Sequence, residues 1–560
     1  MSAGEGMRWI VFAISGLAIL QPGLAAAGQN QNLAAPERAQ AGQTLKIAGT
    51  VVNAITGEPL SQARITIAET KERAKLISMI TSENGHFEFS QVKAGKYSLQ
   101  GAKRGFISSA YEQHEQFSTA IVTGPELSTE NLILRLTPMA LITGHVFDEF
   151  GDGVRKARVG LFMEDHRAGM SRIMRLVNSL SDDRGFYDFS LLRPGKYYVS
   201  VSAKPWYAMH PVAQSDGSNS AAQQISAALD VAYPTTYYHD ATEAESATPI
   251  EVKGGDRLQI DVHLNPTPAL HLLFRIPQDQ QHGFSMPMIQ KHVFDSVEMV
   301  QTDGMHAVAP GVYEVTGVPA GRYNVRGKNA NSGQLEQSSD VELVRDGQEL
   351  SDSRSEPLGS LKLSIKNPGE EALPKPYTVG LQDSRRRIVA FMQGEPSGQI
   401  TFGDLAPGRY TILVFSQTKP YAVARTSSPA GESTGHSVNV TPGAAVDVTA
   451  FLTSGVVSIE GIVHKKDKPV AGIMVALVPD DPEMHIELFR RDQSDFDGTF
   501  LVRGVIPGSY TIVAVEDAWG FEWLQPGVLA RYVQHGQNLT VGPLMRGTVH
   551  LPDPVEVQPH

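Results

Sequence analysis

Apolar and polar residues alternate along most of this chain in short runs, and turn-forming residues separate the runs. Phe87, Glu88 and Phe89 alternate in this way, and Ala94–Gly95 follows a few residues later. A period of two residues predicts a strand with one buried face. Gly and Pro between such runs predict turns. The pattern therefore predicts an all-β protein built from short strands.

One block of 15 residues recurs and organises the whole pattern. It has two glycines ten residues apart and a tyrosine two residues after the second glycine. The block occupies residues 85–99, 185–199, 311–325, 398–412 and 498–512. The first glycine predicts a tight turn in which φ is positive. The tyrosine is expected to bury its ring and to hydrogen-bond the backbone through its hydroxyl, as a tyrosine corner does.

A looser half-block precedes three of the five copies. It begins Gly-x-Val at residues 49–51, 144–146 and 461–463, and continues through a turn into an alternating strand. The third and fourth copies lack the leading glycine, but they keep apolar alternation at residues 270–274 and 361–365. Such spacing predicts one β-sandwich per copy. The predicted domains are residues 44–137, 138–266 (with a long connector), 267–357, 358–454 and 455–560 (with a tail), and the third and fourth are degenerate.

The two halves together resemble the carboxypeptidase regulatory-like domain. Both halves are present in copies one, two and five, whereas copies three and four carry the second half. The resemblance implies an all-β fold, a tandem array of about five seven-stranded sandwiches similar to transthyretin-like, Ig-like or carbohydrate-binding-like domains, in a protein exported by bacteria. It also implies an accessory or cell-surface module. That family offers no catalytic residues and no cofactor to carry over.

Composition narrows the function classes. The chain has 560 residues, no Cys and a net charge of −12. Without cysteine there is no disulfide framework, thiolate metal site or thiol nucleophile. The acidic balance argues against nucleic acid as a partner. Because no disulfide can form, each sandwich must be held together by core packing alone.

The N-terminus has the features of a secretory signal peptide. Arg8 precedes a short apolar run at residues 9–20, and small residues follow, so cleavage is predicted after Ala27. A membrane anchor is the alternative, but about 20 apolar residues are needed to span a bilayer. Residues 1–27 are thus predicted to be a signal peptide and 28–43 a linker. The mature chain, expected to lack a membrane span, would be secreted, periplasmic or on the outer cell surface.

Three motifs that suggest chemistry have simpler interpretations. No histidine is followed by Glu three residues later, as the metallocarboxypeptidase zinc motif requires. Residues 431–435 match G-x-S-x-G as a string, but a polar loop surrounds them instead of the strand and helix of a nucleophile elbow. Asp492, Asp495 and Asp497 form an acidic turn that would allow a weak Ca²⁺ site, although hairpin-turn chemistry explains it as well. We therefore expect no catalytic residue, resident metal or cofactor.

Aromatic residues after the repeated block are the candidate ligand contacts. They are Trp206, Tyr207, Tyr237, Tyr238, Trp519 and Trp523. Aromatic faces in loops can stack on the apolar faces of sugar rings. The alternative, which we favour, is that they pack against a neighbouring domain. The expected partner is an envelope polysaccharide or a protein.

The sequence thus predicts a non-catalytic exported binding or scaffold protein of the bacterial envelope, with adhesion or carbohydrate binding as its role. One alternative is a hydrolase with an unrecognised site in the third and fourth copies, which would need a deep pocket with convergent polar groups. Another is a periplasmic accessory partner of an outer-membrane transporter.

Overall fold

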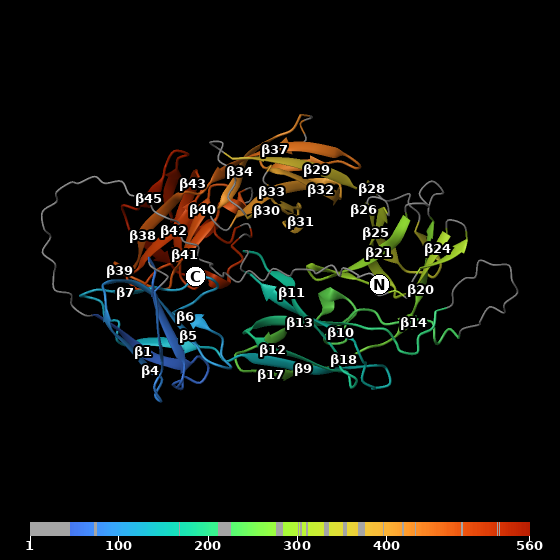
Figure 1. Cartoon of the computed structure of the whole chain (residues 1–560), viewed down its shortest axis with the longest axis horizontal. Coiled ribbons are helices and arrows are strands. Elements are labelled where there is room, and N and C mark those ends of the chain that lie inside the picture. Colours follow the sequence, from blue (N-terminus) through green and yellow to red (C-terminus); the bar gives the residue numbers. More distant parts are fainter. Residues whose placement is uncertain are drawn as a thin grey trace, which may run out of the picture. The chain divides into compact units, whose positions relative to one another are not determined.

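A computed structural model gives the arrangement of the strands (Figure 1). It describes residues 45–71, 75–166, 169–210, 226–275, 284–300, 302, 305–309, 312–329, 335–350, 356–367, 376–395, 397–416, 419–429, 431, 433–482, 485–523, 525 and 527–560. The predicted signal peptide and linker lie outside these residues. In the part of the chain that the structure describes, no helix is long and apolar enough to cross a membrane.

The first two copies of the block each lie in a pair of sheets. The strands of the first sandwich are β1 (Leu45–Asn53), β2 (Arg64–Glu69), β3 (Leu76–Ile80), β4 (His86–Val92), β5 (Gly95–Ala102), β6 (Ser109–Ala110), β7 (Ile121–Thr123) and β8 (Leu132–Leu136). Those of the second are β9 (Ala140–Phe147), β10 (Arg158–Asp165), β11 (Arg172–Leu180), β12 (Phe186–Leu192), β13 (Gly195–Ser202), β14 (Val231–Ala232), β15 (Thr236–Tyr237), β16 (Ile250–Val252), β17 (Arg257–Gln259) and β18 (Val262–His263), with the short helix η1 (Ala244–Ser246).

The third and fourth copies form sheet pairs as well. The third sandwich contains β20 (Leu270–Arg275), β21 (Phe284–Val293), β22 (Ser296–Met299), β23 (Met305–Ala309), β24 (Val312–Val318), β25 (Gly321–Asn329), β26 (Leu335–Leu343), β27 (Gln348–Leu350) and β28 (Glu356–Pro357), and β19 (Thr267–Pro268) before it pairs with β14. The fourth contains β29 (Gly359–Lys366), β30 (Tyr377–Gln382), β31 (Ile388–Gln393), β32 (Gln399–Leu405), β33 (Gly408–Ser416), β34 (Tyr421–Ser427), β35 (Ser433–Thr434), β36 (Ser437–Val440) and β37 (Ala445–Ser454).

The fifth copy adds short helices to its sheets. Its strands are β38 (Val457–Lys465), β39 (Lys468–Pro469), β40 (Met474–Pro479), β41 (Arg490–Gln493), β42 (Thr499–Val505), β43 (Gly508–Val515), β44 (Gln537–Val541), β45 (Gly547–His550) and β46 (Val555–Gln558). Its helices are η5 (Ile486–Leu488), η6 (Ala518–Gly520) and α1 (Ala530–Val533). They lie with a second apolar cluster on the outer face of β40 and β43.

All five copies share one strand pairing. The first strand of each copy pairs antiparallel with the strand inside the repeated block and parallel with a strand near the end of the copy, as β1 does with β4 and β8. The second sheet also has a common order. In the first copy, β5, which carries the tyrosine, pairs with β2, and β2 pairs with the edge strand β3; the other copies repeat this order. The prediction of a tandem all-β sandwich array is confirmed, including the copies without Gly-x-Val. Two-residue strands such as β6 extend the sheets beyond the seven strands expected.

The conserved geometry of the block comes from its glycines and tyrosines. Gly85, Gly185, Gly398 and Gly498 have φ between +71° and +79°, as the turn prediction requires. At Gly185 an added Cβ would meet the Val146 carbonyl oxygen at 2.4 Å. Each tyrosine hydroxyl donates to the carbonyl oxygen four residues earlier. These bonds join Tyr97 to Lys93 (3.2 Å), Tyr197 to Arg193 (2.8 Å), Tyr323 to Pro319 (2.7 Å), Tyr410 to Ala406 (2.5 Å) and Tyr510 to Ile506 (2.6 Å). The tyrosine prediction is confirmed in all five copies.

A bulge inside the block was not predicted. In each copy the pairing register shifts within the strand before the tyrosine, as it does between Phe89 and Val92 and between Phe189 and Leu192. The last residue of the shifted segment has positive φ; it directly precedes Val92, Leu192, Val318, Leu405 or Val505. That residue is Gln91, Leu191 or Asp404 in three copies, and Gly317 or Gly504 in the others. A positive φ at a residue other than Gly, Asn or Asp costs about 1–2 kcal/mol. The sheet pairing on both sides of the bulge must therefore stabilise it.

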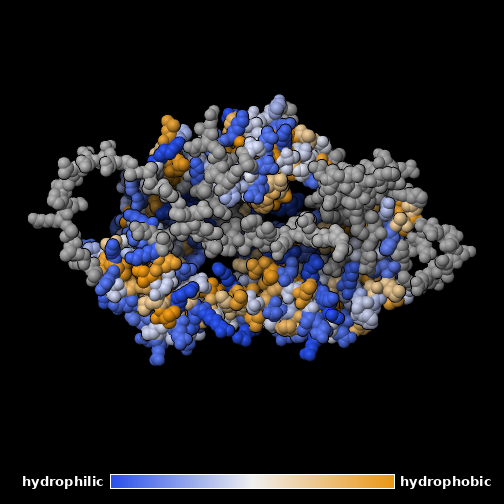
Figure 2. Space-filling model, in the orientation of Figure 1, coloured by the Kyte–Doolittle hydropathy of each residue, from blue (hydrophilic) through white to orange (hydrophobic). Residues whose placement is uncertain are grey.

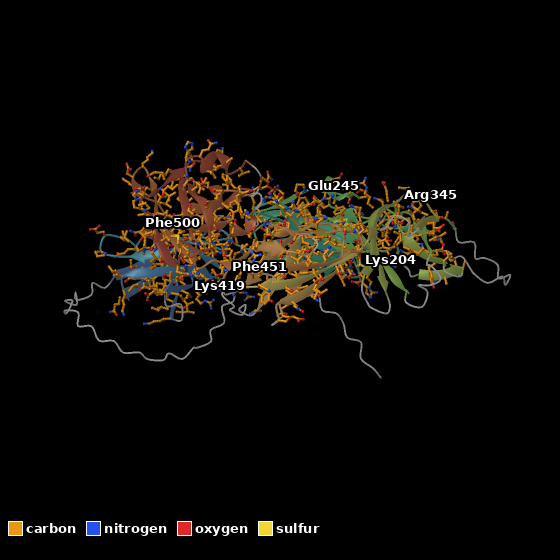
Figure 3. The ribbon with its side chains drawn as sticks, turned by 90° about the horizontal axis from the view of Figure 1, so that it is seen from above. Lys204, Glu245, Arg345, Lys419, Phe451 and Phe500 are labelled. Atoms are coloured by element: carbon orange, nitrogen blue, oxygen red, sulfur yellow. The ribbon has the colours of Figure 1, made fainter. Side chains whose placement is uncertain are left out.

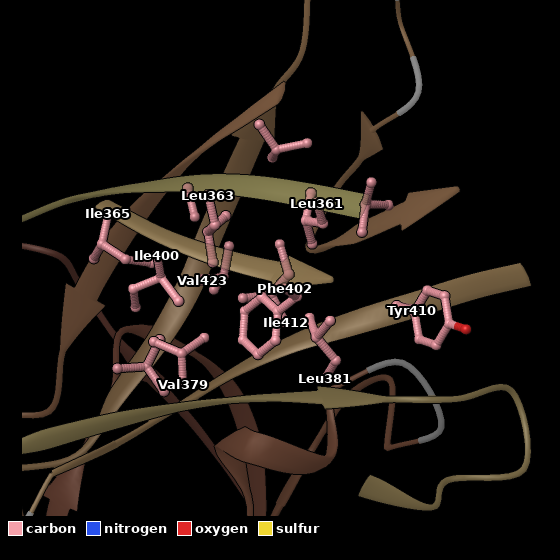
Figure 4. Packing of buried hydrophobic residues seen from close by; sticks show 14 of the residues in the cluster. Leu361, Leu363, Ile365, Val379, Leu381, Ile400, Phe402, Tyr410, Ile412 and Val423 are labelled. Atoms are coloured by element: carbon pink, nitrogen blue, oxygen red, sulfur yellow. The ribbon is translucent and has the colours of Figure 1, made fainter. Parts of the chain in front are cut away.

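Each sandwich has its own apolar core, built from the inward faces of both sheets. Figure 4 shows the core of the fourth sandwich, where Leu361, Leu363 and Phe402 of one sheet face Leu381 and Ile412 of the other. In the fifth, Phe500 of β42, labelled in Figure 3, is fully buried. A buried side chain of this size contributes about 1.5–3 kcal/mol. Packing of this kind explains how the cysteine-free sandwiches are held together.

Candidate functional site

Aromatic rings from the loop after β13 and from the turn between β9 and β10 lie together. We call them the aromatic patch and define it as Trp206 and Tyr207 of the loop and Phe150 of the turn. Trp206 is 85% exposed and Phe150 is 74% exposed. The Tyr207 ring stands edge-on to both, with centroid distances of 5.8 Å to Trp206 and 6.3 Å to Phe150. Two neighbouring exposed rings provide apolar faces on which a ligand can stack.

The aromatic patch is anchored by a carboxylate beneath it. Glu149 accepts hydrogen bonds from the hydroxyls of Tyr207 and Tyr233, the second at 2.7 Å. Burial raises the pKa of Glu149, but these hydrogen bonds outweigh burial and leave the pKa below its usual range. Burial and the bond to Glu149 raise the pKa of Tyr207 to about 12. Tyr207 is therefore a protonated donor at neutral pH, and its hydrogen bond to Glu149 holds the Tyr207 ring of the patch in place.

The turn between β9 and β10 sets the position of Glu149. Asp148 Oδ1 accepts from the backbone N–H groups of Phe150 at 2.9 Å and Asp152 at 2.8 Å. An Asp side chain that bonds the backbone two residues later forms a stable local turn. Phe150 and Glu149 are thus placed by backbone geometry, independently of any ligand.

The other two selected tyrosines make packing contacts, Tyr237 as a buried and Tyr238 as a half-buried side chain. Tyr237 of β15 is fully buried, and its ring is 5.3 Å from that of Phe294, which follows β21 of the third sandwich. Phe162 of β10 packs on the same Phe294 ring at 5.0 Å. Tyr238 packs against the core of the second sandwich. The structure places Tyr237 at a junction between sandwiches.

Of the two C-terminal tryptophans, Trp519 contacts the first sandwich, whereas Trp523 packs on Arg491 and Phe489 of its own sandwich. The Trp519 ring stacks on His114, with a centroid distance of 5.0 Å and an angle of 4°. Arg491 of β41 lies over Trp523, with its guanidinium carbon 4.9 Å from the ring centroid, and over Phe117 at 5.6 Å. The Trp519 contact is of the kind that the packing alternative describes, a ring against a neighbouring sandwich.

Charged groups reinforce this contact between the first and fifth sandwiches. Arg491 makes a two-pronged pair with Glu115, at 2.8 and 3.3 Å, and both side chains are largely buried. Lys96 Nζ is 2.7 Å from Asp495 Oδ2, and the Ala120 N–H donates to Asp495 Oδ1 at 3.0 Å. A bidentate Arg–carboxylate pair fixes orientation as well as distance. The two sandwiches are therefore joined by specific contacts although nearly 400 residues separate them.

The acidic turn considered for calcium takes part in these contacts. Asp495 binds Lys96, and Asp497 Oδ1 accepts from the Thr499 hydroxyl at 2.5 Å. Asp492 Oδ2 accepts from the Leu501 N–H at 2.7 Å. Burial raises the pKa of Asp492 to about 6 and also raises that of Asp495. Each carboxylate thus has a protein donor in this arrangement.

One group of residues in the described part of the chain has the donors and spacing of a metal site. His436 of the fourth sandwich faces His485 and Glu487 of the fifth, and their candidate ligand atoms all lie within 4.8 Å of one another. Burial lowers the pKa of His436, which favours the neutral imidazole that metals bind. The search for His-x-x-Glu missed this group because its donors come from two sandwiches. The G-x-S-x-G string nearby does not form an elbow, since Ser433 lies in β35, which pairs with β36.

The middle sandwiches border an open crevice of about 810 Å³. Its lining includes Asp383, Arg385 and Arg387 of the fourth sandwich and His292 of the third. Asp383 Oδ1 accepts from the N–H groups of Arg385 and Arg387, at 2.9 and 2.8 Å, and Oδ2 binds the Arg387 side chain at 2.9 Å. This carboxylate therefore closes a turn.

The outer edges of the sandwiches carry large exposed apolar side chains at equivalent strands. The residues are Leu76, Ile77 and Ile80 of β3, Met174, Leu176, Val177 and Leu180 of β11, Val297 and Met299 of β22, and Val389, Phe391 and Met392 of β31. We call these four strands the apolar edges; each ends the second sheet of its copy. On the face in Figure 2, hydrophobic and hydrophilic residues are interspersed in small patches.

Comparisons with known proteins support the sandwich assignment at the N-terminus. Residues 46–123 match the family model of the carboxypeptidase regulatory-like domain. No curated protein matches the chain significantly. Similar solved structures include the TIE protein of Bacillus anthracis (12% identity, TM-score 0.17, covering 72% of this chain and 68% of that chain), a streptococcal ancillary pilin (12%, 0.20, 50% and 98%) and BcpA, the major pilin subunit of Bacillus cereus (10%, 0.15, 73% and 99%).

The family match covers β1 to β7, and the later copies repeat the pairing of those strands. The fold, the repeated block and the match agree with one another. The chain is a tandem β-sandwich protein whose first sandwich is similar to the carboxypeptidase regulatory-like domain.

Proposed function

We propose that this chain is a non-catalytic binding scaffold, exported to the bacterial envelope, that holds its sandwiches in a fixed arrangement and binds a partner protein through the apolar edges. The N-terminal signal pattern supports export. The observation that carries the proposal is that the same edge strand has exposed apolar side chains in four sandwiches. These strands are the apolar edges β3, β11, β22 and β31.

The same edge already makes contacts between sandwiches within the chain. In the fifth copy it is β41, whose Arg491 and Gln493 bind the first sandwich. In the second and third copies, the Ile173 N–H of β11 donates to Asp295 beside β22 at 2.8 Å. Edge strands with exposed apolar residues favour association. The β3 and β31 edges are the ones we assign to an external partner.

The test measures retention of the purified chain on isolated bacterial envelope fractions. Ile80→Lys and Phe391→Lys place a charge on β3 and β31 and should each reduce retention about tenfold, which corresponds to about 1.4 kcal/mol. Leu544→Lys, at an exposed apolar residue outside these strands, is the matched control and should leave retention unchanged. Equal retention of all variants would refute the proposal.

A second candidate function, polysaccharide binding, is supported by the aromatic patch. Its anchored, exposed rings suit stacking on sugar rings. Binding to envelope polysaccharides should fall with Trp206→Ala and Phe150→Ala. It should persist with Leu544→Ala, which removes an exposed apolar side chain elsewhere. If no polysaccharide binds the intact chain, this branch is wrong and the apolar-edge proposal stands.

A further inference from the structure

The contact between the fourth and fifth sandwiches brings together three metal-binding side chains. His436 lies between β35 and β36, whereas His485 and Glu487 lie at the start of η5. The two imidazole rings are 5.1 Å apart between centroids and are tilted by 48°. Two imidazole nitrogens and a carboxylate oxygen from different sandwiches thus converge on one point.

The surroundings hold the backbone of these three residues in place. The His436 carbonyl accepts from the Ile412 N–H at 3.1 Å, which ties its loop to β33. On the other side, the Leu488 N–H donates to the His485 carbonyl at 3.0 Å, and Arg490 donates to the Glu487 carbonyl at 2.8 Å. Backbone contacts on both sides therefore position the donors before any ligand arrives, which lowers the cost of binding.

Glu487 supplies an independent observation that points to a cation. Its Oε1 atom is 3.3 Å from His485 Nδ1. Its Oε2 atom is buried and has no hydrogen-bond partner among the described residues. His436 is only 5% exposed, so little water reaches this side of the group. A buried carboxylate oxygen without a donor costs free energy that a bound cation would offset.

We propose that His436, His485 and Glu487 bind a divalent transition-metal ion of the Zn²⁺ class, which links the fourth sandwich to the fifth. Two histidines and one carboxylate are a donor set that Zn²⁺ prefers, whereas Ca²⁺ and Mg²⁺ prefer oxygen alone. Tetrahedral bonds of about 2.0–2.1 Å require ligand atoms about 3.4 Å apart. The candidate ligand atoms lie within 4.8 Å of one another, so binding requires side-chain rotations that bring them closer. Asp481 adds negative charge nearby, and Arg409 opposes it.

Calorimetric titration of the chelator-treated full chain with Zn²⁺ tests the proposal. We expect one site that Glu487→Gln and His485→Ala each weaken at least tenfold. His550→Ala is the matched control, because His550 Nδ1 is 3.1 Å from Glu460 in a histidine–carboxylate pair to which the structure assigns no third donor among the described residues. This control should leave the site intact.

A spectroscopic readout separates the site from adventitious binding to the other histidines. Co²⁺ in the wild-type chain should give the visible absorption of a tetrahedral ion, and His436→Ala should abolish it. Glu487→Gln, which keeps the side-chain shape, serves if His436→Ala does not fold. The proposal is overturned if the wild type binds no Zn²⁺, or if Glu487→Gln and His550→Ala bind it equally well. It is independent of the binding partner proposed above.

Discussion

Replacing Asp492 by asparagine should stabilise the fifth sandwich at neutral pH. Asp492 lies on β41, and its carboxylate accepts from the Leu501 N–H at 2.7 Å. Its pKa is raised from 3.8 to about 6. Burial is the main cause and the neighbouring Asp495 adds to it, whereas the backbone bonds from Leu501 and Gln493 and the charge of Arg503 oppose the shift. Because an asparagine carbonyl can accept the same bond, Asp492→Asn removes the charge and keeps the contact.

The magnitude follows from proton linkage. Between about pH 4 and pH 6 the folded state keeps a proton that the unfolded state has released, so stability falls as pH rises through this window. A shift of about two pKa units at 1.36 kcal/mol each gives a penalty of at most about 3 kcal/mol above pH 6. Solvent that reaches the half-buried side chain reduces this figure. Asp492→Asn should therefore gain up to about 3 kcal/mol at pH 7 and almost nothing at pH 4.

Urea unfolding followed by tryptophan fluorescence measures this difference. Trp519 and Trp523 report on the fifth sandwich, and a Trp206→Phe background removes the signal of the second. Asp553→Asn, at an exposed carboxylate of the same sandwich, is the control and should change neither the stability nor its pH slope. The reasoning is refuted if Asp492→Asn keeps the wild-type slope between pH 4 and 6, or if it destabilises the sandwich at pH 7.

Three further predictions concern other positions in the chain. Tyr510→Phe leaves the buried Ile506 carbonyl without its 2.6 Å donor and should cost about 1–3 kcal/mol in urea unfolding, whereas Tyr97→Phe, which loses a 3.2 Å bond, should cost less. Leu191→Gly should stabilise the second sandwich by about 0.5–1 kcal/mol, because Leu191 is 70% exposed with φ of 62°, whereas Leu180→Gly within β11 should destabilise it; equal effects would contradict the bulge argument. Burial lowers the pKa of His271, but its bonds to Asp230 (3.0 Å) and Glu314 (3.1 Å) outweigh burial and raise it; the stabilisation is therefore complete below about pH 6.5 and lost as pH rises through the folded pKa. His271→Gln should remove that slope in urea midpoints measured from about pH 6 to about pH 9, and an unchanged slope would exclude His271 as its source.

Local features of the fold could be predicted because each depends on neighbours within a few residues. The turn at Gly185 needs only a residue that tolerates positive φ, and the Tyr197 bond reaches back only four residues. The bulge at Leu191 escaped prediction although it is just as local. Its left-handed residue is Gln, Leu or Asp in three copies, so no common side chain marks the position.

The candidate sites depended on contacts that no local pattern contains. Trp206 and Trp519 both follow a copy of the repeated block, yet Trp206 is exposed and Trp519 stacks on His114 of the first sandwich. The group of His436 and His485 was likewise invisible to motif searches, since its donors are about 50 residues apart and in different sandwiches.

By itself the sequence determined an all-β chain with five copies of one sandwich pattern, because strand alternation, turn glycines and the buried tyrosine are encoded within each copy. Only the tertiary structure decided which edges and aromatic rings remain exposed and which are used between sandwiches. The physical reason is that exposure is a property of how folded units pack on one another. Charge pairs such as Arg491 with Glu115 form between residues whose separation along the chain carries no signal of their contact.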